Sequence, residues 1–150
     1  MSGSLALKLK TTRKQQNLRQ YEVAGFLKVS QNSLSRYEKN TRIPNLQILT
    51  NLAQYYQISI DWLLGKARHK YKKNHHWNGE FISEYKFPER LKEARENKNM
   101  SQSKLGRLLK IMPSNVTLYE QGKTEPSLEN LVLIAEILGV TVDWLVGLED

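Results

Sequence analysis

The functional signal of the sequence lies in one stretch, residues 20–38. Gln31, Asn32 and Arg36 stand in the second half of this stretch. Glutamine and asparagine amides can each pair with an adenine edge, and an arginine guanidinium can pair with O6 and N7 of guanine. The sequence shows no phosphate-binding loop, no paired catalytic carboxylates and no nucleophile–histidine arrangement. The absence of these arrangements from the sequence predicts that the protein is not an enzyme.

The charge of the chain narrows the class of partner. Its 150 residues include 23 Lys and Arg against 15 Asp and Glu, a net charge of +8. This balance favours a polyanionic partner, either nucleic acid or an anionic membrane. The chain has no cysteine, which excludes disulfides, thiolate zinc sites and iron–sulfur clusters. No apolar run approaches the roughly 18 residues of a membrane span. We therefore expect a cytoplasmic protein without a cofactor or a membrane partner.

An internal repeat organises the chain. A shift of 82 residues places residues 8–65 on residues 90–147 without a gap, with 17 identities in 58 positions. Such self-similarity predicts two copies of one domain of about 60 residues. The first domain, a basic linker and the second domain are predicted at residues 1–67, 68–87 and 88–150.

Each copy has the apolar spacing of short helices and no competing strand pattern. Leu46, Leu49 and Leu52 belong to a helical stripe that begins shortly after Pro44. In the first copy, helices are predicted at residues 6–16, 20–27, 31–38, 46–56 and 60–64, and the second copy follows at the same offset. The last helix of each copy has predicted N-caps at Ser59 and Thr141 and left-handed glycines at Gly65 and Gly147. The predicted fold class is therefore all-α.

The stretch that carries the polar side chains meets the demands of a helix-turn-helix. A short helix opens at Gln20, a tight turn follows at residues 28–30, and Ala24 is small where two helices would cross. Together with Tyr-Glu at the end of the third helix, a proline before the fourth and Asp-Trp-Leu in the fifth, this pattern resembles the phage Cro/repressor-type family, also called XRE. The resemblance implies two tandem five-helix, lambda repressor-like domains. It also implies a sequence-specific DNA-binding transcriptional regulator, most simply a repressor that occupies an operator.

The resemblance assigns expected contacts to double-stranded DNA. Gln31, Asn32 and Arg36 match the residues of the recognition helix that point at base edges. The side chains expected at or near the phosphates of the first site are Gln20, Ser33, Lys39, Asn40 and Arg42. The matching candidates in the second copy are Gln102, Ser114, Asn115 and Lys123.

Other repeated residues have expected structural roles. Arg13 and Glu38 recur in the second copy as Arg95 and Glu120, again 25 residues apart. The resemblance implies that each pair forms an internal salt bridge. It also implies that the tryptophan of each fifth helix packs into the base of the core of its domain.

The turn of each copy departs from the family pattern. Lys28 and Lys110 occupy the turn position where the family usually has glycine. If that position keeps a positive φ, each lysine costs about 1 kcal/mol relative to glycine.

The two copies are not equivalent. Residues 1–67 carry a net charge of +7, the segment 68–89 carries +2, and residues 90–150 carry −1. At the positions of Gln31 and Arg36 the second copy has Pro113 and Leu118, so it lacks the strongest base-reading groups. Two interpretations remain open: a weaker DNA reader within one long asymmetric site, or an association domain.

Alternatives also remain for the whole chain. It can act as a homodimer or as an intrachain pseudo-dimer of its two copies. The rival to DNA regulation is an antitoxin-like or scaffold module that keeps the fold but binds a protein. The basic linker contains all three histidines, interleaved with aromatic residues, and is interpreted either as an arm along DNA or as a solvated tether. No carboxylate or thiol stands at a ligand spacing from them, so no metal site is predicted.

Overall fold

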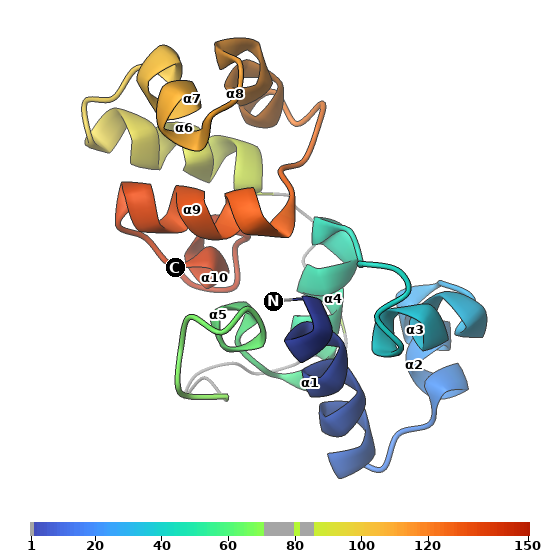
Figure 1. The fold of residues 1–150 in the computed structure, drawn as a ribbon. Coiled ribbons are helices and arrows are strands. Elements are labelled where there is room, and N and C mark those ends of the chain that lie inside the picture. Colours follow the sequence, from blue (N-terminus) through green and yellow to red (C-terminus); the bar gives the residue numbers. More distant parts are fainter. Residues whose placement is uncertain (1, 71–79, 82–85) are drawn as a thin grey trace. The chain divides into compact units, whose positions relative to one another are not determined.

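The computed structural model describes residues 2–70, 80–81 and 86–150. In both halves of the chain the secondary-structure elements of these residues are helices (Figure 1). The chain forms two compact units, Met1–Phe81 and Ile82–Asp150. The helices of the first unit are α1 (Ser2–Gln15), α2 (Gln20–Leu27), α3 (Gln31–Glu38), α4 (Leu46–Tyr56) and α5 (Ile60–Leu63). Those of the second unit are α6 (Phe87–Asn97), α7 (Gln102–Leu109), α8 (Pro113–Glu120), α9 (Leu128–Leu138) and α10 (Val142–Leu145). The predicted all-α class is confirmed, with five helices in each described half.

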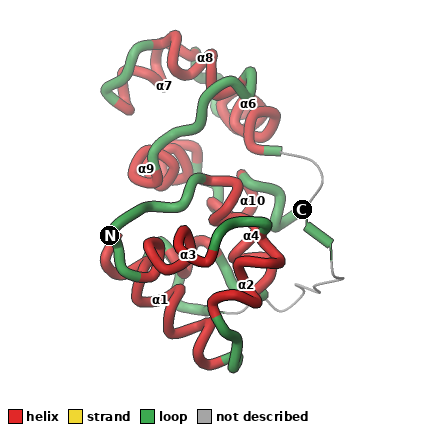
Figure 2. Tube along the Cα trace, turned by 90° about the vertical axis from the view of Figure 1, so that its right-hand side faces the viewer, coloured by secondary structure: helices red, strands yellow, loops and turns green. Residues whose placement is uncertain are grey.

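The helix boundaries follow the sequence prediction closely, and short loops join the helices within each unit (Figure 2). The largest difference is at the start of α1, which begins at Ser2 and not at residue 6. Leu5 and Ala6 are buried with relative exposures of 2% and 4%. Because these two residues pack into the core, the helix continues toward the N-terminus beyond the predicted start.

Apolar residues from all five helices make the core of the first unit. Leu9, Leu34 and Leu49 are at most 1% exposed, and they come from α1, α3 and α4. The second unit repeats this arrangement with fully buried residues from α6 to α10: Phe87, Leu91, Leu105, Val116, Leu131 and Val142. The two helices of each helix-turn-helix pack against each other, α2 with α3 and α7 with α8.

The predicted caps of the fifth helices are confirmed. The Ser59 hydroxyl accepts a hydrogen bond from the Trp62 backbone N–H at 3.2 Å, and Thr141 caps α10 in the same way at 3.0 Å. Gly65 and Gly147 follow with φ of 79° and 90°, the left-handed region that favours glycine. Each capped turn fixes the direction in which the chain leaves its domain.

The turn inside each helix-turn-helix is left-handed even though lysine occupies it. Lys28 has φ 55° and Lys110 has φ 57°, and each is the C-cap of its helix. Both lysines therefore carry the backbone cost of about 1 kcal/mol that glycine would avoid. Asn40, with φ 60°, keeps the conformation that Gly122 adopts at the equivalent place in the second unit.

The tryptophans of α5 and α10 lie at the edge of each core and not inside it. Trp62 is half-buried, with the Lys8 ammonium 4.8 Å from its ring centroid, and Trp144 is half-buried beside the Arg90 guanidinium at the same distance. The neighbouring Ile60 and Leu63 fill the core in α5. A four-residue helix can turn only one face inward, so the tryptophan is left between core and solvent.

Part of the predicted linker packs on the first unit. The Ser59 N–H donates to the Lys70 carbonyl at 3.0 Å, and the Gln54 amide donates to the Glu80 carbonyl at 3.2 Å. Residues 71–79 and 82–85 lie outside the described residues, and with them His75, His76 and most of the basic arm. In the described parts of the chain no cluster of His, Cys, Asp and Glu could hold a metal ion. None of the helices described is long and apolar enough to cross a membrane.

Candidate nucleic-acid interface

The polar side chains of the first recognition helix are positioned by its opposite face. Leu34 and Tyr37 of α3 are 0% and 5% exposed, and they anchor the helix on the core. Gln31, Asn32 and Arg36 are all exposed on the remaining surface of the helix. Since α2 packs against α3, this polar surface is held on a rigid pair of helices (Figure 1). The structure therefore brings the three predicted base-reading side chains onto one accessible helix.

The start of α3 is fixed by a serine cap. The Ser30 hydroxyl oxygen accepts a hydrogen bond from the Ser33 N–H at 3.0 Å, and the two hydroxyls also lie 3.0 Å apart. A serine N-cap typically contributes about 1 kcal/mol to a helix. Ser33 is half-buried and engaged in this cap, whereas Gln31 and Asn32 beside it remain exposed.

A tight turn after α3 presents three more predicted contact residues. Lys39, Asn40 and Arg42 are exposed. The Arg36 carbonyl accepts hydrogen bonds from the backbone N–H groups of Thr41 and Arg42, at 3.0 and 3.3 Å. Within the described residues, no salt bridge engages Arg36, Lys39 or Arg42. The turn therefore carries cations that are available to an external anion.

A buried ion pair joins α1 to the end of α3. The Arg13 Nε donates to Glu38 Oε1 at 2.6 Å, and a second guanidinium nitrogen donates to Oε2 at 3.0 Å. A third nitrogen of Arg13 donates to the Leu18 carbonyl at 2.8 Å. The hydrogen bond to Glu38 raises the pKa of Arg13 above its ordinary value. This bidentate pair holds the recognition helix against the first helix.

The predicted phosphate anchor Gln20 joins the same network. Its amide donates to Glu38 Oε2 at 3.0 Å, and the residue is half-buried at the start of α2. An amide NH₂ has two hydrogens, so one stays available to a phosphate beside α2. Sequence reasoning missed this contact to Glu38, because residues 18 apart show no local pattern that pairs them.

The second unit repeats the network with one addition. Arg95 donates to both oxygens of Glu120, at 2.5 and 3.2 Å, and Gln102 donates to Glu120 at 2.8 Å. The Thr117 hydroxyl also donates to the side-chain oxygen of Gln102, Oε1, at 2.7 Å. Both ends of the Gln102 amide are therefore engaged within the protein, whereas Gln20 is engaged through its NH₂ group alone among the described contacts.

The surface of the second helix-turn-helix is partly apolar. Ser114 and Lys123 are exposed and Asn115 is half-buried, so these candidate contacts are accessible. Leu118, at the position of Arg36, is half-buried. Sequence reasoning missed Met112, the N-cap of α8, which is 67% exposed and forms no side-chain cap.

Leu108 of α7 is 49% exposed, and Phe26, at the same position of the first unit, is 52% exposed. The signal that would have found Met112 is the 82-residue shift, which pairs this methionine with the capping Ser30.

Comparison with known families matches both copies. The helix-turn-helix family model matches residues 9–63 and again residues 91–145. These two matches contain the helix-turn-helix pairs α2–α3 and α7–α8, together with both Arg–Glu pairs.

Curated relatives match over one domain's length. An SPbeta prophage-derived uncharacterized HTH-type transcriptional regulator of Bacillus subtilis, YonR, is 42% identical over 59 residues, which cover 39% of this chain and 55% of that protein. The HTH-type transcriptional regulator ImmR of the same organism is 40% identical over 63 residues, 42% of this chain and 50% of that protein. The HTH-type transcriptional activator BcrR of Enterococcus faecalis is 33% identical over 64 residues, 43% of this chain and 31% of that protein. The chain thus spans about half or less of these relatives' lengths. No solved structure matches it.

Proposed function

The chain belongs to the helix-turn-helix family of the XRE/Cro type, in two tandem copies, and on this premise we propose that it is a sequence-specific DNA-binding transcriptional regulator. The observation that carries the proposal is the exposed polar face of α3. There Gln31, Asn32 and Arg36 stand on a helix whose other face is locked into the core by Leu34 and Tyr37. A rigid helix with an exposed row of amide and guanidinium groups is suited to the major groove.

Base recognition and backbone contact fall to different residues. Gln31 and Asn32 have the amides that pair with adenine, and Arg36 has the guanidinium that pairs with guanine. Lys39 and Arg42 follow α3 and supply positive charge for the phosphates on one side of the groove. Beside them, Asn40 and Ser33 are candidates for the sugar–phosphate backbone, and the second amide hydrogen of Gln20 is a candidate donor to a phosphate on the α2 side.

We propose that the protein acts as a repressor by occupying an operator, with no reaction catalysed. Binding of α3 to a promoter site would exclude other proteins from the same groove. One relative is named a transcriptional activator and others are named transcriptional regulators, so the direction of regulation needs its own test. A reporter gene placed behind a DNA site that the chain binds should lose expression when the chain is supplied. A rise in expression would contradict repression but leave DNA binding intact.

The second unit has a separate candidate function as an association domain. Met112 is exposed at the N-cap of α8, where the first unit has Ser30, and Leu118 replaces the arginine of the first unit. Apolar surface on an otherwise polar face is typical of protein contact. The competing interpretation is a weaker DNA reader, which Ser114, Asn115 and Lys123 would serve.

Selection of bound sites from random duplex DNA tests both units. If the first unit alone reads DNA and the chain dimerises, the selected sites contain two inverted copies of one half-site. If both units read DNA, each site contains two different half-sites from one chain. Failure to enrich any sequence, together with retention of a protein partner, would favour the antitoxin-like or scaffold alternative.

A matched pair of variants then identifies the reading helix. Arg36→Ala should remove about 1–3 kcal/mol of discrimination at one base position. Leu118→Ala, at the equivalent position of α8, should leave base preference nearly unchanged, because leucine has no hydrogen-bond donor. If Leu118 serves association, its variant should lower the mass in solution. Relaxed base preference in Leu118→Ala, with none in Arg36→Ala, would assign recognition to the other unit.

A further inference from the structure

The positive charge of the second unit is concentrated in its helix-turn-helix. Residues 102–123 contain a single acid, Glu120, and four cations, which we call the α7–α8 cations: Lys104, Arg107, Lys110 and Lys123. The remaining residues of 90–150 contain four cations and eight acids. The net charge of −1 for residues 90–150 is therefore the sum of a basic α7–α8 pair and an acidic remainder.

All four α7–α8 cations are exposed. No salt bridge or side-chain hydrogen bond in the described part of the chain engages any of them. The acid of the same stretch does not neutralise them, because the Glu120 side chain is 5% exposed and accepts hydrogen bonds from Arg95. The helix-turn-helix thus presents four positive charges to an external anion.

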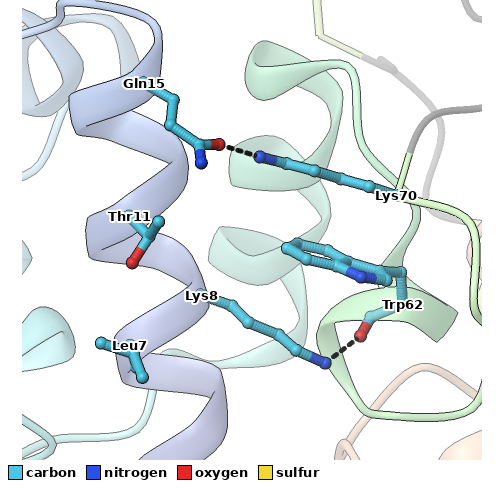
Figure 3. A pocket seen from close by; sticks show the side chains of 6 residues that line it. All are labelled: Leu7, Lys8, Thr11, Gln15, Trp62 and Lys70. Carbon is cyan, nitrogen blue, oxygen red and sulfur yellow. Dashed lines mark hydrogen bonds between the residues drawn. The ribbon is translucent and has the colours of Figure 1, made fainter.

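The lysines beside Trp62 in the first unit differ from this group. Lys8 and Lys70 line a cavity next to the indole (Figure 3). Lys8 donates to the Trp62 carbonyl at 2.6 Å, and Lys70 donates to the Gln15 side-chain oxygen at 2.5 Å. Arg90 repeats the Lys8 contact beside the second tryptophan. Those cations serve the packing of their own domains.

The two copies also place their cations differently along the helix-turn-helix. In α8, Leu118 replaces the arginine of the first unit, so the second copy has no cation where bases would be read. In α7, by contrast, Lys104 and Arg107 stand where α2 has an acid and a glycine, Glu22 and Gly25. Phosphate contacts position a protein on DNA but carry no sequence information. The second copy therefore has charge suited to phosphates and little that is suited to bases.

The fold places these cations at both ends of α8. Gly106 faces the start of α8, because a Cβ added to it would lie 3.1 Å from the Ile111 carbonyl oxygen. Arg107 follows Gly106, and Lys110 is the C-cap of α7 three residues further on, so the two lie on one side of that helix. Lys123 follows the last residue of α8. Positive charge therefore flanks the helix that would approach the groove.

We propose that the second unit binds duplex DNA through phosphate contacts of the α7–α8 cations and adds affinity without adding sequence preference. Double-stranded DNA carries one negative charge per about 1.7 Å of its axis. Such a polyanion attracts the basic α7–α8 pair and repels the acidic remainder, which fixes the side of the domain that approaches it. This inference rests on the proposed function, and of the two interpretations of the second unit it favours DNA contact over association.

A matched pair of variants tests the contact. Arg107→Gln and Lys98→Gln each remove one exposed cation from the second unit, but Lys98 lies outside the helix-turn-helix, beside Gly139. The measurement is the affinity of the full chain for an unrelated duplex of about three helical turns, roughly 30 base pairs, by fluorescence anisotropy over a range of salt. Arg107→Gln should reduce the log–log slope by about 0.9, and Lys98→Gln should leave it unchanged.

A triple variant tests the absence of sequence preference. Replacement of Lys104, Arg107 and Lys110 by glutamine should reduce the slope by up to about 2.7. Binding to the selected site and to the unrelated duplex should weaken by the same factor, because phosphate contacts are made with any sequence. The melting curve should stay unchanged, since all three side chains are exposed.

The outcomes separate this inference from the proposed function. The inference is overturned if Arg107→Gln changes the slope no more than Lys98→Gln, or if the triple variant changes it by less than about 0.9. It is also overturned if the triple variant alters the ratio of the two affinities. If the chain prefers no sequence but Arg107→Gln still reduces the slope on the unrelated duplex, the proposed function fails and the phosphate contact stands. If the chain binds no duplex, both fail.

Discussion

Replacement of Arg13 by alanine should destabilise the first unit through the charge that it leaves behind. The side chain of Glu38 is only 2% exposed, and that of Arg13 is 10% exposed. In Arg13→Ala, the Glu38 carboxylate loses two hydrogen bonds from the guanidinium, at 2.6 and 3.0 Å. The Leu18 carbonyl loses its bond to Arg13 as well. The carboxylate must then stay buried without a cation or take up a proton.

The expected loss of unfolding free energy in Arg13→Ala lies toward the lower end of the range for broken buried ion pairs. Removal of one partner of a buried ion pair typically costs about 3–5 kcal/mol. Gln20 still donates to Glu38 at 3.0 Å, and this bond offsets part of the loss. We therefore expect about 3 kcal/mol for Arg13→Ala. In a domain of this size each kcal/mol moves the melting midpoint by about 4–8 °C, so the midpoint should fall by at least about 12 °C.

Calorimetric melting of the full chain measures this change, and the repeat provides a matched variant. Arg95→Ala removes the same contacts from Glu120, whose side chain is 5% exposed, and should destabilise the second unit. The double variant Arg13→Met with Glu38→Gln should recover most of the stability, because no charge is then left buried.

Two results would refute this reasoning. One is a midpoint for Arg13→Ala within about 4 °C of the unchanged protein, a shift equivalent to less than about 1 kcal/mol. The other is a change of base preference in Arg13→Ala measured where the variant is still folded, since that would indicate direct contact with DNA. The first result would show that the ion pair contributes little to the stability of the first unit, and the second would show that Arg13 has a role in reading DNA.

Three further outcomes follow from the same geometry. Lys28→Gly should raise the free energy of unfolding by about 1 kcal/mol, because glycine accepts φ 55° without strain; urea denaturation measures this, and a loss of stability would contradict the assigned turn. Tyr56→Phe should leave the stability unchanged or raise it by up to about 1 kcal/mol, since the buried Tyr56 hydroxyl has no hydrogen-bond partner among the described residues; a clear loss in the same assay would reveal a partner. If Lys39 and Arg42 each contact a phosphate, the log–log slope of DNA affinity against salt should be about −2 or steeper, and Lys39→Ala should reduce it by about 0.9; a flat slope would argue against DNA as the partner.

Because the chain contains an internal repeat, much of its structure could be predicted from the sequence. The positions of α2–α5 and α7–α10 followed from local spacing, capping residues and prolines, because these signals act within one or two turns. The pairing of Arg13 with Glu38, 25 residues away, was expected only because the resemblance implied it and the second copy repeats both residues. The loss of Gln31 and Arg36 in the second copy was visible in the same way, by direct comparison.

Tertiary packing decided what local spacing does not encode. The orientation of α5 on the core buries Ile60 and Leu63 and leaves Trp62 at the edge of the core. There Lys8 and Lys70 lie beside the indole. The cavity beside this tryptophan needs residues more than fifty positions apart to meet. The engagement of Gln20 by Glu38 likewise depends on the crossing of two helices. Local sequence specifies which helices form, but the distances between their side chains arise only when the whole core packs.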